Sequence, residues 1–174
     1  MIRFVLPALV FLFFILEGTV FQVFSPERYG ASFVLIPRLV LIGIVIIGAF
    51  RGRVSGVSYG LIFGLLYDIV YTEILGVYMF SMGLIGYICS LPYKLVQQSF
   101  FLLACIIMVA VSIQEYYLYG MYTMLGVAYI SPDQFFYERF LPTFIFNIVF
   151  SMIIIIPLQK LNRYVEEFEK QLEK

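Results

Sequence analysis

Long apolar segments follow one another along almost the whole chain, separated by short clusters of proline, glycine and charged residues. Only 13% of the 174 residues are charged, about half of the roughly 25% that is typical of soluble domains. A helix needs about 20 apolar residues to cross a membrane, and the runs are too long for the roughly 10-residue strands of a membrane barrel. The sequence therefore predicts an all-α integral membrane protein, a six-transmembrane-helix bundle over residues 1–157 with spans near 4–24, 34–50, 54–72, 74–92, 99–125 and 139–157.

The basic residues predict how this bundle is oriented, because short loops rich in Lys and Arg stay in the cytoplasm. With an even number of spans both termini lie on one side, which would hold eight of the eleven basic residues. We therefore expect both termini in the cytoplasm. The eight are Arg3, Arg51, Arg53, Lys94, Lys160, Arg163, Lys170 and Lys174, against Arg28, Arg38 and Arg139 on the other side.

A ladder of small residues runs through the third span and ends at an acid: Gly56, Gly60, Gly64 and Asp68, each four residues after the last. Four residues are about 400° of α-helix, so the glycines form one slowly drifting stripe. In lipid, small residues on a shared face allow the close backbone approach that holds apolar helices together. The stripe predicts a packing surface that Asp68 continues. A plainer interpretation is that glycine is common in membrane helices and Asp68 extends to the nearer membrane surface.

Four ionisable residues lie within the predicted spans at a similar depth, in the outer third: Glu17, Arg38, Asp68 and Glu115. At 1.5 Å per residue, Glu17 and Asp68 are each about 21 Å from the inner end of their spans. Such residues usually face a bundle interior, a partner or a wet cavity. Asp68 is expected either to pair with Arg38 or to be neutral and hydrogen-bonded to a facing helix. Glu115, among several tyrosines, is expected to extend to the outer surface.

Pro37 lies inside the apolar run that begins the second span. Proline suits the first turn of a helix, where its missing N–H would have no partner anyway. If Pro37 occupies that turn, the helix runs only from about residue 37 to residue 50 and Arg38 is interfacial. A short helix and a locally thinned bilayer would follow.

The last 17 residues, 158–174, differ in character from the rest. Their apolar positions recur at spacings of three and four, which is a heptad seam, and their four basic and four acidic residues balance. We expect a cytoplasmic amphipathic helix after Pro157 that either lies on the membrane or packs on a protein. Balanced charge weakens attraction to anionic lipid. The seam is formed by Leu158, Leu161, Val165, Phe168 and Leu172.

The residues needed for most catalytic chemistry are missing. The chain has no histidine, the commonest general base and metal ligand. It shows no nucleophile elbow and no phosphate-binding glycine loop, and its scattered basic residues do not suggest nucleic-acid binding. Cys89 and Cys105 lie in apolar spans without metal-ligand spacing. The sequence therefore predicts no enzyme activity, no cofactor and no metal.

The stretch from IPRLVLIGIVIIGAF to SGVSYGLIFGLLYDIVYTEILGVYMFSMGLIGYICSLPYKL resembles the rod shape-determining protein MreD family of bacteria. That family typically has a proline opening the second span, small residues ending in an aspartate in the third, then a glycine, and a Gly/Ala-Tyr pair in the fourth. The resemblance covers the chain in length and span count, with specific residues confined to about 37–95. The matching residues are Pro37, Gly60, Gly64, Asp68, Gly76, Gly86 and Tyr87.

The resemblance implies a non-enzymatic scaffold of the machinery that elongates the cell and directs lateral peptidoglycan synthesis. Its implied partners are MreC, the MreB filament, the RodA polymerase and a class B penicillin-binding transpeptidase. It adds Gly76 and Gly86 to the expected helix-packing glycines and implies a location in the bacterial cytoplasmic membrane. Asp68 is expected to be a buried polar or partner contact, and so are Arg38 and Glu17 because of their depth in the predicted spans. The resemblance also implies a fold similar to the substrate-binding subunits of energy-coupling-factor vitamin transporters.

Vitamin transport is the alternative function. A vitamin-binding subunit would be of similar size and would bind its ligand from the outer side, where the four buried charges are expected. Such sites usually hold a small ligand with directional polar groups, whereas this chain lacks Trp and His, and Asn147 is the only asparagine in a span.

Overall fold

The computed structural model describes residues 5–23, 30, 32–91 and 94–172, and in this part of the chain every regular element is helical. The predicted spans correspond to helices whose ends differ from the expected ones by at most a few residues, except at two places: α2 begins at Leu39 rather than near residue 34, and α8 continues to Leu172 rather than ending near residue 157. Two short elements, α5 and α7, and a π-helical turn, η3, lie between them. The helices are α1 (Val5–Val23), α2 (Leu39–Arg51), α3 (Arg53–Tyr71), α4 (Val77–Ile88), α5 (Lys94–Gln98), α6 (Phe100–Met124), α7 (Pro132–Gln134), η3 (Phe135–Phe140) and α8 (Leu141–Leu172).

Three of the described helical segments are long and apolar enough to cross a membrane, namely Arg53–Tyr71, Phe100–Met124 and Pro132–Leu161. Shorter apolar helices cover Val5–Thr19, Leu39–Arg51 and Val77–Ile88. The all-helical membrane architecture is therefore confirmed, whereas the count of six crossings stays a prediction.

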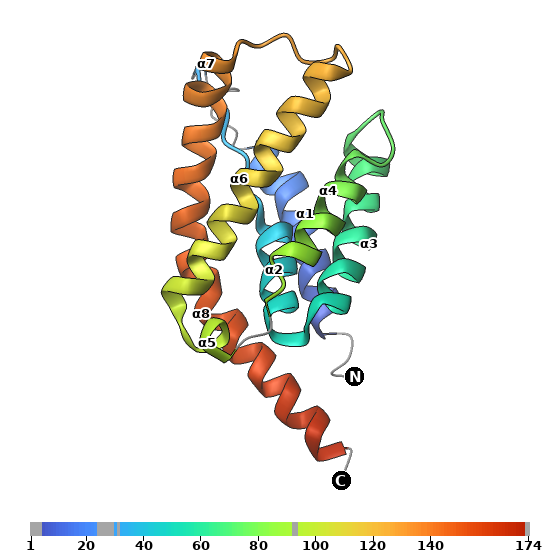
Figure 1. The fold of residues 1–174 in the computed structure, drawn as a ribbon, viewed down its shortest axis with the longest axis vertical. Helices are drawn as coiled ribbons and strands as arrows, with labels where there is room; N and C mark the ends of the chain where they lie inside the picture. The colour runs from blue at the N-terminus through green and yellow to red at the C-terminus, as the bar shows by residue number, and fades with distance from the viewer. Residues whose placement is uncertain (1–4, 24–29, 31, 92–93, 173–174) are drawn as a thin grey trace.

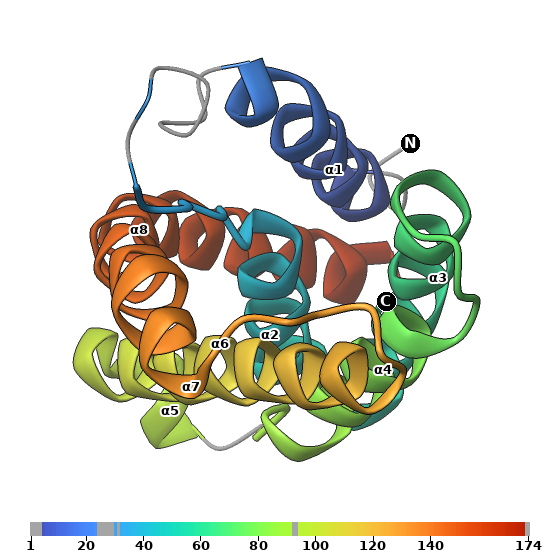
Figure 2. The same ribbon diagram turned by 90° about the horizontal axis from the view of Figure 1, so that it is seen from above.

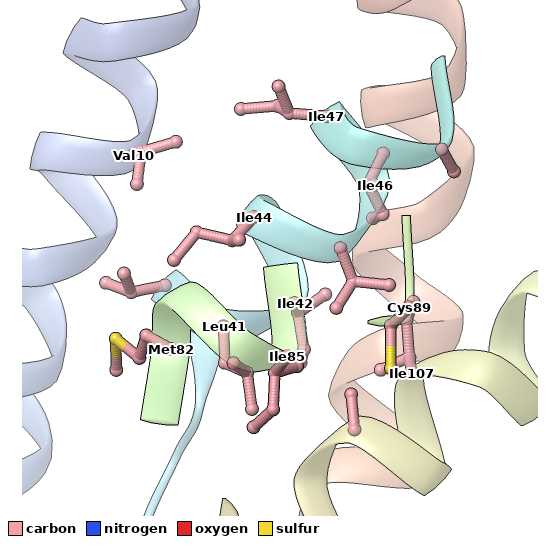
Figure 3. Close-up of a cluster of buried hydrophobic side chains, with 14 of the residues drawn as sticks. Val10, Leu41, Ile42, Ile44, Ile46, Ile47, Met82, Ile85, Cys89 and Ile107 are labelled. Atoms are coloured by element: carbon pink, nitrogen blue, oxygen red, sulfur yellow. The ribbon is translucent and has the colours of Figure 1, made fainter. Parts of the chain in front are cut away.

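The short helix α2 forms the centre of the bundle. In the view from above, α1, α3, α4, α6 and α8 surround it (Figure 2). Every residue from Leu39 to Ala49 is buried, which is why this segment reads as a continuous apolar run without a polar face. Figure 3 shows its isoleucines directed toward different neighbours, with Val10 of α1, Met82 and Ile85 of α4 and Ile107 of α6 close by.

At 13 residues, α2 is only about 20 Å long, less than the roughly 30 Å of hydrocarbon in a bilayer. The second helix is thus short, as expected from Pro37, although Pro37 precedes the N-cap residue Arg38 and does not occupy the first turn. Residues 33–38 approach it in non-helical conformation, so the chain reaches the middle of the bundle partly as extended backbone.

The start of α1 and the end of α8 lie at the same end of the molecule (Figure 1). The helix α8 runs without interruption from Leu141 to Leu172 and contains Pro157, so the expected amphipathic tail continues the last span rather than forming a separate helix. Its final turns project beyond the bundle (Figure 1).

Candidate functional site

The helices α3 and α4 make backbone contact at the predicted glycine stripe. A Cβ atom added to Gly60 would lie 2.4 Å from the Met82 carbonyl oxygen, and one added to Gly64 would lie 2.6 Å from the Met79 Cα atom. At Gly56 it would lie 2.6 Å from the carbonyl oxygen of Gly86. Real Cβ atoms do not come so close to backbone, so any larger residue at these three positions would push α3 and α4 apart.

Gly86 belongs to the same contact, because a Cβ atom there would lie 2.4 Å from the Gly56 carbonyl oxygen. Gly76 does not, and its expected place among the packing glycines is wrong. Nothing lies within 4 Å of where its Cβ atom would be, but its φ angle is +103°. Glycine at this position provides a left-handed conformation at the start of α4, which other residues adopt only with strain.

Asp68 caps the N-terminus of α4 from the neighbouring helix α3. Its Oδ2 atom accepts hydrogen bonds from the backbone N–H groups of Gly76 and Met79, both at 2.9 Å, and its Oδ1 atom accepts one from Tyr78 at 2.8 Å. The first N–H groups of a helix have no partner within it and carry partial positive charge. A fully buried carboxylate is therefore well satisfied here. Of the expectations for Asp68, hydrogen bonding to a facing helix matches this geometry.

Arg38 pairs with Glu115, not with Asp68. The Glu115 Oε1 atom lies 2.7 Å from the Arg38 Nε atom and 2.5 Å from its Nη2 atom. Arg139 approaches the other carboxylate oxygen, with Nε 3.3 Å from Oε2. Both Arg38 and Glu115 are buried, so the expectations of an interfacial Arg38 and of a Glu115 that reaches the outer surface are wrong. Arg38 and Asp68 are linked only through Tyr78, whose ring centroid is 5.7 Å from the Arg38 Cζ atom.

Glu17 and Asn147 satisfy the N-terminus of α2. Glu17 of α1 accepts a hydrogen bond from the Val40 N–H at 3.1 Å, and the Asn147 Oδ1 atom accepts one from the Arg38 N–H at 2.8 Å. Asn147 also donates to the Ile36 carbonyl at 2.9 Å. Three helices therefore meet at one buried helix end, where α1 supplies an acid and α8 an amide.

The segment before α2 docks along η3 and the start of α8 with alternate N–H groups. Val34 donates to the Glu138 carbonyl at 2.7 Å and Ile36 to the Thr143 hydroxyl at 3.2 Å, followed by the Arg38 bond to Asn147. Non-helical backbone at membrane depth is tolerated only where protein satisfies it. Asn147 stands out in the sequence as the only asparagine in a predicted span, but its place at the start of α2 was not predicted. Thr143 lies four residues before Asn147 and hence on the same helical face. This pair of polar residues was the sequence signal for a polar contact on that face.

The seam of the C-terminal tail is divided between two environments. Leu158 is buried and Leu161 packs against the core cluster, so the first two seam positions belong to the bundle. The side chains of Val165, Phe168 and Leu172 lie outside the described residues, and their role in association stays a prediction.

These arrangements share one property: the buried charged and amide groups join helices to each other. Asp68, Glu17 and Glu115 each accept from backbone or arginine donors on another element. Among the described residues there is no cluster of three or more His, Cys, Asp or Glu that could hold a metal. The fold and site define a helical membrane protein whose buried polar groups join helices.

The chain belongs to the rod shape-determining protein MreD family. The family model for rod shape-determining protein MreD matches residues 2–165. The chain is also similar to the "Rod shape-determining protein MreD" of Bacillus subtilis (strain 168), with 31% identity over 157 residues, which are 90% of this chain and 91% of that protein. No solved structure matches it.

Proposed function

We propose that the protein is a non-enzymatic scaffold of the bacterial cell-elongation machinery, anchored in the cytoplasmic membrane with six spans and both termini in the cytoplasm. Family membership over residues 2–165 carries this proposal. Its proposed partners are MreC, the MreB filament, the RodA polymerase and a class B penicillin-binding transpeptidase. In this role the protein would hold those partners at one place in the membrane so that lateral peptidoglycan synthesis follows the filament.

The structure of the polar cluster supports a scaffold more than a transporter subunit. Arg38, Glu115, Asp68 and Glu17 already contact protein groups, so binding a polar ligand there would require breaking contacts that hold helices together. Breaking a buried ion pair is costly. A rigid bundle with exposed apolar helix faces is suited to lateral association within the bilayer.

Complementation tests the proposed function. Expression of the chain in Bacillus subtilis depleted of its own MreD should restore rod-shaped cells, measured as cell width and aspect ratio. The Gly64→Leu variant should reach the membrane less well or fail to restore rod shape. The neighbouring Leu65→Ala variant is the matched control and should restore it. Round cells in which the wild-type chain is abundant in the membrane would contradict the proposal.

Copurification tests the partners. Crosslinking in intact cells followed by affinity purification should recover MreC and RodA with the tagged chain, and should not recover an unrelated membrane protein of equal abundance. Equilibrium binding of radiolabelled vitamins to the purified protein tests the alternative of a vitamin-transporter subunit. Saturable binding of a vitamin together with failed complementation would favour that alternative.

A further inference from the structure

The last helix, α8, has a weak point where it leaves the bundle. Pro157 lies inside this helix, and it removes one backbone hydrogen bond because it has no N–H to donate to the carbonyl four residues earlier. Prolines are among the few causes of sharp bends in long helices. In Figure 1 the final turns of α8 run at an angle to its upper turns. Left to itself, this part of α8 would act as a hinge between the last span and the tail.

The first residues after Pro157 are held by the bundle. Leu158 is buried in the hydrophobic core, and Leu161 packs against that core. Between them, the Gln159 Nε2 atom donates a hydrogen bond to the Gln97 backbone carbonyl at 3.4 Å. The base of the tail is therefore fixed to the core and to α5 within about one turn of the proline.

Gln97 of α5 is itself tied to the C-terminal turn of the central helix. Its Nε2 atom donates to the Ala49 carbonyl at 2.9 Å, in the last turn of α2, where carbonyls lack a partner within the helix. The neighbouring Val96 is buried in the core, so packing holds α5 as well as this bond. Ala49, Gln97 and Gln159 thus form a chain of contacts from α2 through α5 to the tail, which we call the glutamine joint.

The helix α8 is attached to the other end of α2 as well. The Asn147 Oδ1 atom accepts a hydrogen bond from the Arg38 N–H at 2.8 Å. At 1.5 Å per residue, Arg38 and Ala49 are about 17 Å apart along α2, and Asn147 and Gln159 are about 18 Å apart along α8. The two helices pack against each other and run in the same direction with matching spacing. Both ends of α2 are therefore bonded to α8, one directly and one through α5.

We propose that the glutamine joint splints α8 across Pro157, so that the tail keeps a fixed direction relative to the bundle. A load on the tail then reaches the central helix instead of being absorbed at the proline. Because the N-terminus of α2 carries Arg38, which pairs with Glu115, the splint links the tail mechanically to the buried polar groups at the opposite end of the bundle. It rests on contacts within this chain and does not depend on the proposed role in cell elongation.

The distance between two spin labels tests the splint. Cys105 on α6 is exposed and takes one label, Cys89→Ala removes the buried second thiol, and Glu169→Cys in the tail takes the other label. Residue 169 is about 18 Å along the helix from Pro157, so a swing of about 20° about the proline would move it by about 6 Å. Measured by pulsed electron paramagnetic resonance in lipid nanodiscs, the distance distribution of this doubly labelled protein should show a single narrow peak.

Variants of the joint should release the hinge. Gln159→Met keeps the length of the side chain but removes the donor to α5, and it should broaden the peak by about 6 Å. Gln97→Met, which removes the bond between α5 and α2, should also broaden it. Gln98→Met changes the next residue, which is exposed, and as the matched control it should leave the peak narrow.

Pro157→Ala distinguishes a splint from a general loosening of the bundle. Alanine restores the missing N–H and makes α8 stiff without the joint, so Gln159→Met in the Pro157→Ala background should leave the peak narrow. Circular dichroism confirms that each variant is folded. The proposal is overturned by a broad distribution without any joint variant, by a peak that stays narrow with Gln159→Met alone, or by equal broadening with and without the proline.

Discussion

The pairing of Arg38 with Glu115 makes a quantitative prediction about stability. Removing one partner of a buried ion pair leaves the other charge without compensation and typically costs about 3–5 kcal/mol. The Glu115→Leu variant removes the carboxylate that contacts Arg38 and leaves this buried cation beside the Tyr78 ring and under the weaker influence of Glu17, so we expect a loss of about 4 kcal/mol. The Arg38→Met variant leaves Glu115 next to Arg139, whose Nε atom is 3.3 Å away, and a smaller loss of about 2 kcal/mol is expected.

The double variant distinguishes a direct pair from two independent effects. Arg38→Met with Glu115→Leu removes both charges and leaves none stranded, so its loss should be about 3 kcal/mol rather than the additive 6, a coupling of about 3 kcal/mol. Against a total stability of about 5–15 kcal/mol this is large. For a chain of this size, about 4 kcal/mol corresponds to a fall of roughly 8–16 °C in Tm.

A matched cycle on a pair that does not touch provides the control. Arg38→Met combined with Asp68→Asn should show a coupling below about 1 kcal/mol, because the two side chains do not contact each other and share only Tyr78. All variants are purified in one detergent, and thermal unfolding is followed by circular dichroism and by aggregation. Additive losses for Arg38 and Glu115, or strong coupling between Arg38 and Asp68, would refute the assignment of the pair.

Three further predictions concern packing, the tail and topology. Gly64→Leu should lower Tm by at least several degrees, because a Cβ atom alone would lie 2.6 Å from backbone of α4 and overpacking costs about 1–3 kcal/mol or more. The exposed Leu65→Ala should change Tm little, and equal Tm values would exclude a close helix contact. Phe168→Asp should reduce recovery of the MreB filament protein with the tagged chain without changing membrane insertion; unchanged recovery would leave the tail as an interfacial helix. In cysteine labelling of intact cells, Arg28→Cys should react with an impermeant reagent and Lys174→Cys should not, and the reverse would invert the topology.

The course of the helices and the stripe of α3 could be predicted because each depends on local spacing. Apolar length predicts helices at membrane depth, and a repeat of four residues places Gly56, Gly60 and Gly64 on one face whatever the partner helix is. That the partner is α4 follows from the short connection, since adjacent helices joined by a tight turn pack side by side.

The pairing of charges could not be predicted from depth alone. Depth gives the position of Arg38, Asp68 and Glu115 along the membrane normal, but not the rotation of each helix about its axis, and rotation decides which of them meet. Tyrosines near Glu115 in sequence suggested an interfacial belt. In the structure one of them, Tyr119, stacks on Phe135 of η3 at 4.1 Å between ring centroids, while Glu115 faces the interior between two arginines.

The docking of residues 34–38 along α8 sets an order of events during synthesis. The N–H groups of Ile36 and Arg38 bond to side chains that follow 107 and 109 residues later, after all the other long helices have left the ribosome. Until Thr143 and Asn147 arrive, this backbone has no protein partner and cannot rest in hydrocarbon. The segment that leads into the central helix is therefore among the first to be made and the last to be secured. A nascent chain truncated before Thr143 would leave the N–H groups of Ile36 and Arg38 without these partners, however well its earlier helices insert.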